Sequence, residues 1–145
     1  MTVSVNNDAR ETTYRLSTFI KLSLGQIILK VDPDSPSFSG KKTITNDVAK
    51  TTGTIGFYQK GLNIQQVYLT DGNTRIPLTV SSSDYGIEHG KASQNIAVNH
   101  YKLHIAFDGN FNSTSDDMCL SKFEGLNYIF TQCENMYARC AFPTL

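Results

Sequence analysis

Short apolar stretches separated by turn residues constrain this chain more than any other feature. Stretches rich in β-branched and aromatic residues recur at intervals of about 8–12 residues, between clusters of Gly, Pro, Asp and Ser. They lie at residues 26–32, 38–48, 54–58, 62–69, 76–80, 85–88, 95–107 and 126–132. This spacing is typical of an antiparallel β-sandwich or open barrel. We therefore expect an all-β fold, with one short helical turn over Met136–Cys140.

Local patterns predict how the strands connect. The apolar pattern changes phase at Gln65-Gln66, which predicts a β-bulge. Val67–Leu69 and Ile76–Val80 flank a turn signal and predict a hairpin. Residues 95–107 predict the longest strand, and residues 108–125 are polar enough to predict a long surface loop.

Length and composition exclude several classes of protein. The 145 residues predict a loose N-terminal arm over 1–13 and a single β-sandwich domain over 14–145. Thirteen acidic and thirteen basic residues give no net charge, so we expect neither a nucleic-acid nor a membrane partner. No secretory signal is visible, and Cys119, Cys133 and Cys140 are odd in number. Both observations favour a reducing, cytoplasmic setting.

Gln132 and Glu134 are the candidate binding residues. They lie two positions apart in a β-prone stretch, and alternate residues of a strand point to the same face. An amide oxygen and a carboxylate side by side suit a cationic group such as a free α-ammonium, because charge-assisted hydrogen bonds are strong. The spacing alone also fits a polar strand end followed by a helix start.

The surrounding sequence resembles a known family. Thr131-Gln132-x-Glu134, Ala138-Arg139 and Ala141-Phe142-Pro143 resemble the end of the N-terminal domain of the aminopeptidase N family of zinc exopeptidases. Tyr14-Arg15-Leu16 and Phe38-Ser39-Gly40 are similar to phrases nearer the start of that domain.

The resemblance implies a saddle-like β-sandwich that recognises the free amino terminus of a peptide through Gln132 and Glu134. It also implies a partner, the catalytic zinc domain, that would complete the aminopeptidase. It leaves open whether the chain is a piece cut at a domain boundary, a split gene product or a diverged stand-alone copy.

This chain does not carry the residues that hydrolysis needs. The family's zinc motif, His-Glu-x-x-His, does not occur in the sequence. His100 and His104 are four residues apart, but the alternation around them predicts a strand, in which four residues span about 13 Å. We therefore expect no metal or cofactor in this chain, with zinc held by the catalytic domain, and no activity of the chain alone.

Two other classes of function stay open. The first is a stand-alone β-sandwich module that binds a partner and has no peptidase role. A fully polar surface would favour this module, whereas an exposed apolar face would favour the aminopeptidase domain. The second is a cysteine hydrolase using Cys133 or Cys140, although the sequence shows no arrangement of nucleophile and base.

Overall fold

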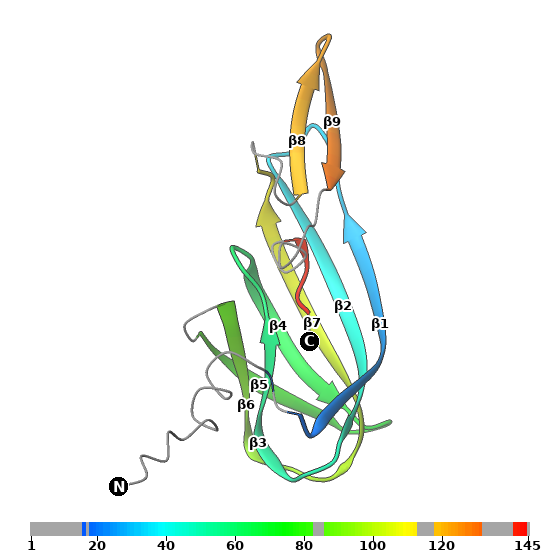
Figure 1. Ribbon diagram of the computed structural model, residues 1–145, viewed down its shortest axis with the longest axis vertical. Helices are drawn as coiled ribbons and strands as arrows, with labels where there is room; N and C mark the ends of the chain where they lie inside the picture. The colour runs from blue at the N-terminus through cyan, green and yellow to red at the C-terminus, as the bar shows by residue number, and fades with distance from the viewer. Residues whose placement is uncertain (1–15, 17, 83–85, 113–117, 132–140, 145) are drawn as a thin grey trace, which may run out of the picture.

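The computed structural model describes Leu16 and residues 18–82, 86–112, 118–131 and 141–144. Its strands are β1 (Ile20–Lys30), β2 (Ser37–Val48), β3 (Thr52–Tyr58), β4 (Asn63–Thr70), β5 (Arg75–Ser82), β6 (Ile87–Ile96), β7 (Asn99–Asn110), β8 (Met118–Phe123) and β9 (Leu126–Thr131). The predicted all-β antiparallel fold, a curled sandwich or saddle, is confirmed (Figure 1). Within the described residues no helix is long and apolar enough to cross a bilayer.

Seven strands form one antiparallel sheet and two form a separate hairpin. The order in the large sheet is β1-β2-β7-β4-β5-β6-β3, so β1 and β3 are its edges. β8 pairs with β9, and the resulting hairpin projects beyond the end of the large sheet (Figure 1). The hairpin leads directly into the segment that contains the candidate binding residues.

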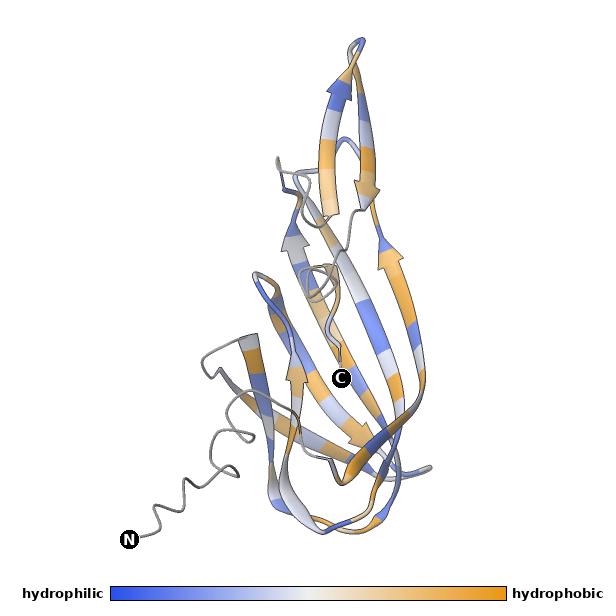
Figure 2. Ribbon diagram, viewed as in Figure 1, coloured by the Kyte–Doolittle hydropathy of each residue, from blue (hydrophilic) through white to orange (hydrophobic). Residues whose placement is uncertain are grey.

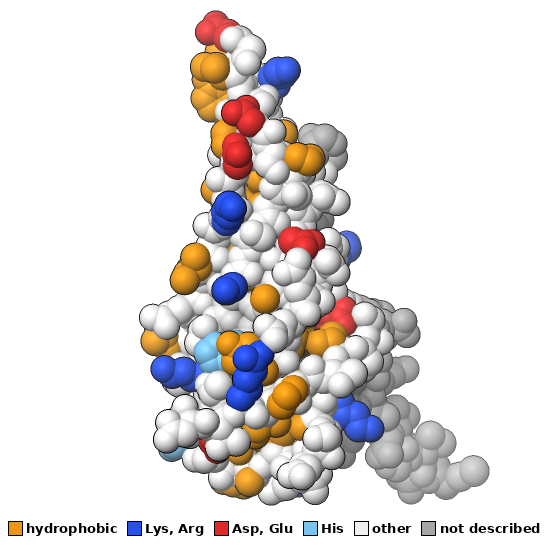
Figure 3. Space-filling model, turned by 180° about the vertical axis from the view of Figure 1, so that it is seen from behind, with side chains coloured by type: hydrophobic (Ala, Val, Ile, Leu, Met, Phe, Trp, Pro, Cys, Tyr) orange, Lys and Arg blue, Asp and Glu red, His pale blue; other side chains and the backbone are white. Residues whose placement is uncertain are grey.

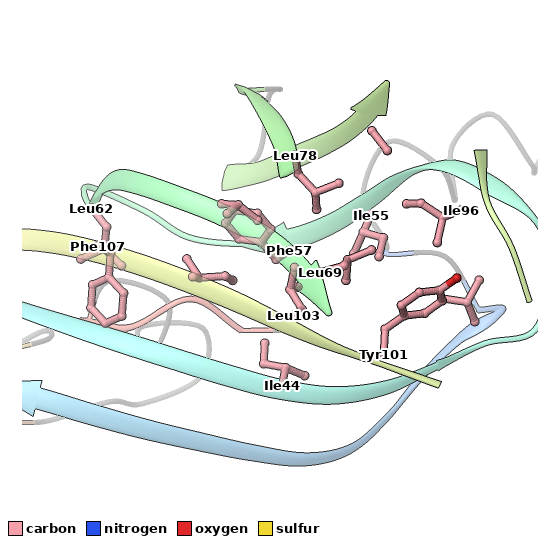
Figure 4. Packing of buried hydrophobic residues seen from close by; sticks show 14 of the residues in the cluster. Ile44, Ile55, Phe57, Leu62, Leu69, Leu78, Ile96, Tyr101, Leu103 and Phe107 are labelled. Carbon is pink, nitrogen blue, oxygen red and sulfur yellow. The ribbon is translucent and has the colours of Figure 1, made fainter. Parts of the chain in front are cut away.

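The core lies inside the curl of the large sheet. Alternate residues of the long strand β7 are buried, as expected when one face of a strand packs inward. Figure 4 shows side chains of this cluster pointing toward one another in the interior. The largest fully buried hydrophobic side chains include Phe57, Phe107, Ile44, Ile55, Leu69, Leu103 and Ile105.

Two predicted connections are confirmed. Val67 lies opposite Leu78 in the β4–β5 hairpin. The register of β4 against β7 shifts between Ile64 and Gln66, where the sequence predicts a bulge.

Two other predictions are wrong. Residues 95–107 do not form a single strand, because β6 ends at Ile96 and β7 begins at Asn99. Tyr101 OH donates a hydrogen bond to the Ala97 carbonyl (2.9 Å), which ties the intervening turn to the start of β7. Residues 108–125 are not one loop either, since β8 forms within them and gains its backbone partners from β9.

Candidate functional site

The two candidate binding residues, Gln132 and Glu134, lie outside the described residues. Cys133 and the helical turn expected over Met136–Cys140 lie outside them too, as does the arm expected over 1–13. The structure does describe both flanks of segment 132–140. β9 precedes this segment, and residues 141–144 follow it.

The C-terminal flank is fixed to the large sheet. Thr144 and Tyr58 form an antiparallel bridge at the end of β3. Thr144 N donates to the Tyr58 carbonyl (2.9 Å), and Tyr58 N donates to the Thr144 carbonyl (2.7 Å). Ala141 and Pro143 are fully buried. The chain that follows the candidate segment is therefore part of the folded core.

Lys42 adds a second anchor to this flank. Its Nζ donates a hydrogen bond to the Pro143 carbonyl (2.6 Å) and lies 4.6 Å from the centre of the Phe142 ring. Burial lowers the pKa of the Lys42 ammonium from its ordinary value. Lys42 lies on the same face of β2 as the buried Ile44 and Val48, and a basic residue in phase with inward-facing residues was the sequence signal that could have found it.

The N-terminal flank is the β8–β9 hairpin, which exposes an apolar face. Phe123, Leu126, Tyr128 and Phe130 are 64%, 61%, 47% and 43% exposed. Register places Phe123 opposite Leu126, so all four side chains lie on the same face of the hairpin. Figure 2 shows hydrophobic residues along this projection. A two-stranded hairpin is only marginally stable by itself, so this face is suited to being covered by another surface.

Contacts at the base of the hairpin and near its turn attach it to neighbouring parts of the fold. Asn112 N donates to the Met118 carbonyl (2.9 Å), and Leu120 N donates to the Asn112 carbonyl (3.0 Å). Asn127 Nδ2 donates to Asp34 Oδ1 (3.1 Å) in the turn between β1 and β2. The turn of the hairpin is tight, with positive φ at both of its central residues, as type I′ turns require.

His100 and His104 lie on β7, as the predicted strand requires, and do not form a shared site. His104 Nδ1 lies 3.3 Å from Thr43 Oγ1, and its Nε2 lies 2.9 Å from Thr70 Oγ1. His100 is exposed and pairs through Nδ1 with Asp47. The part of the chain that the structure describes contains no group of three metal-ligating side chains.

The environment of His104 predicts that the stability of the fold depends on pH. Burial lowers the pKa of His104 from the ordinary value of about 6.5, and the positive charges of Lys102 and Arg75 lower it further. Between the folded-state pKa and about pH 6.5 the unfolded chain binds more protons than the folded chain. We therefore expect stability to fall as the pH is lowered through this window, and to change no further from this group below it.

Urea unfolding at about pH 7.5 and about pH 5.5 measures this slope. His104→Gln should flatten it, whereas the exposed-site control His100→Gln should not remove the contribution of His104. An NMR titration of His104 with a midpoint above the ordinary histidine value would contradict the expectation.

The sequence model described as the Peptidase M1 N-terminal domain matches residues 12–145. No curated protein matches the chain significantly.

Proposed function

The chain belongs to the Peptidase M1 N-terminal domain family, and from this premise we propose that it recognises the free amino terminus of peptides for a zinc aminopeptidase. Glu134 pairs with the substrate α-ammonium, and Gln132 accepts a further hydrogen bond from it. Holding the chain end in this way sets the first peptide bond in place and makes the assembled enzyme an exopeptidase.

The observation that carries the proposal is the exposed apolar face of the β8–β9 hairpin. This face lies immediately before segment 132–140 in the chain, and a partner that covers Tyr128 and Phe130 would approach Gln132 and Glu134 at the same time. Covering would also exclude water from the ion pair, which strengthens it. A stand-alone module with a fully polar surface is not supported by this face.

The zinc belongs to the partner in this proposal. The described residues offer no cluster that fits a metal ion, so we assign no step to zinc within this chain. The chain contributes binding and orientation of the substrate, and the flank that follows the recognition segment is anchored to the large sheet. Tyr58 and Lys42 hold that flank through the contacts to Thr144 and Pro143.

Hydrolysis of amino-acid anilides tests the proposal. The purified chain should show no hydrolysis alone, and activity should appear when it is mixed with a separately expressed M1 zinc domain. Hydrolysis by the isolated chain with no metal added would contradict the proposal. Equal activity of the zinc domain with and without the chain would contradict it as well.

The hairpin face should control assembly with the zinc domain. The double substitution Leu126→Ser and Tyr128→Ser is expected to weaken binding at least about tenfold, because tyrosines that become buried on binding often dominate the energy of such interfaces and the leucine adds apolar area. Isothermal titration calorimetry measures the change. Val98 is 60% exposed in the turn between β6 and β7, away from the hairpin, so Val98→Ser is the matched control. An equal loss for the control would remove the hairpin from the interface.

A further inference from the structure

β1 is an edge strand with an open side. Its only strand neighbour in the described sheet is β2, and the register with β2 is regular from Leu24 to Lys30. A β-bulge between Leu22 and Leu24 interrupts the pairing before that stretch. The regular part therefore presents backbone donors and acceptors along its free side, as edge strands do.

Apolar side chains of β1 are exposed on both faces of the sheet. Leu22 lies opposite the buried Asn46, so Leu22 and Ile27 lie on the face that carries the core. Leu24 and Ile28 lie on the opposite face. The exposed fractions are 50% for Leu22, 38% for Ile27, 55% for Leu24 and 74% for Ile28.

Exposure on both faces restricts what can cover this edge. A surface that packs on one face of the sheet leaves the side chains of the other face in water. A strand added beside β1 covers both, because its own side chains alternate between the two faces while its backbone pairs with the free edge. The geometry therefore favours an extended segment over a folded surface.

The charged side chains at the ends of β1 restrict further which segment can bind there. Lys21 and Lys30 are exposed at the two ends of β1, on the face of Leu24 and Ile28. Figure 3, in which β1 lies at the left margin, shows hydrophobic and basic side chains interspersed along that side. If two copies of the chain paired antiparallel along β1, the Lys21 end of each strand would lie near the Lys30 end of the other. Like charges in this position are destabilising.

We propose that β1 binds an extended segment of a partner protein by strand addition. The segment is β-branched and apolar in its middle and carries a carboxylate side chain at each end. Its apolar residues cover Leu24, Ile27 and Ile28, and its end carboxylates pair with Lys21 and Lys30. This interaction is separate from substrate recognition and does not depend on it.

A labelled peptide, Glu-Thr-Val-Val-Val-Val-Val-Thr-Glu, places its end carboxylates and Val side chains on the face of Lys21 and Lys30 and further Val side chains on the other face, and it tests the proposal by fluorescence anisotropy against the full chain. We expect it to bind at least about tenfold more tightly than the same peptide with Lys at both ends. Ile28→Glu should abolish binding of the acidic peptide, and the similarly exposed Val98→Glu should leave it unchanged. Binding that ignores the charge of the peptide ends, or that survives Ile28→Glu, would overturn the proposal.

Two further measurements distinguish the proposed partner segment from a second copy of the chain and from the zinc domain. Sedimentation should show a monomer at the concentration of the binding assay, and a dimer that Ile28→Glu dissociates would assign the edge to a second copy instead. Hydrogen exchange of the β1 amides should slow with the acidic peptide and not with an M1 zinc domain. Protection by the zinc domain would overturn the inference while leaving the proposed peptidase function intact.

Discussion

Phe107→Ala is expected to lower the free energy of unfolding by about 3–5 kcal/mol, the range for deleting a buried aromatic ring. Phe107 is fully buried on β7 and lies opposite Gly40 of β2. A Cβ on Gly40 would lie only 2.6 Å from Phe107 Cζ, so the ring occupies the space that this glycine leaves open. Small domains are stable by about 5–15 kcal/mol, so the variant should be close to unfolded in mild denaturant.

Urea unfolding followed by circular dichroism measures this loss. The matched control is Phe123→Ala, which removes a 64% exposed ring from the hairpin and should change stability little. The reverse substitution, Gly40→Ala, should cost about 1–3 kcal/mol by overpacking. In the Phe107→Ala background the same change should cost less, because the closest clash, the one with the ring, is gone. Equal costs in the two backgrounds would refute the coupling of this pair.

The close approach of Phe107 to Gly40 explains why a glycine stands at this position of the sequence. Phe38-Ser39-Gly40 resembles a family phrase, and the sequence alone gives no reason for the glycine. The structure supplies the reason, since Gly40 Cβ would also lie 2.9 Å from Leu29 Cδ2 and 3.0 Å from the Ile28 carbonyl. Contacts from three strands meet at this position, and such non-local contacts are invisible in local patterns.

Composition and local apolar pattern predicted the strands well where one face is buried. The stretch 38–48 matches β2 closely, and the phase change at Gln65-Gln66 marks a real register shift. Prediction failed where tertiary contacts decide the outcome. The turn between β6 and β7 contains Ala97 and Val98 rather than Gly or Pro, and the Tyr101 hydroxyl secures it.

The candidate site was only partly predictable for the same reason. Gln132 and Glu134 follow from spacing and resemblance, and they stay a prediction because they lie outside the described residues. Lys42 was missed because its role depends on Pro143, about a hundred residues away in the chain. The alternation of Leu126, Tyr128 and Phe130 was visible, but a pattern does not reveal whether an apolar face is buried or open.

Glu134→Gln is expected to lower kcat/KM for free amino-acid anilides by about a hundredfold in the mixture with the zinc domain. An exposed ion pair contributes only about 0–1 kcal/mol. Once the zinc domain covers the site, loss of one charged partner costs about 2–5 kcal/mol, and each 1.4 kcal/mol is a factor of about ten. The size of the effect therefore reports whether the carboxylate is desolvated by the partner.

Steady-state kinetics of the mixture measures this change, and two controls isolate its cause. Asp71→Asn removes the same charge from the exposed turn between β4 and β5, outside the β8–β9 hairpin, and should leave kcat/KM unchanged. N-acetylated substrates lack the ammonium group, so their residual hydrolysis should be insensitive to Glu134→Gln. An equal fall for free and acetylated substrates would mean that Glu134 acts on the assembly or on the zinc domain, and not on the substrate's amino terminus. A fall of only twofold or so would indicate a solvated carboxylate, since that corresponds to the energy of an exposed pair.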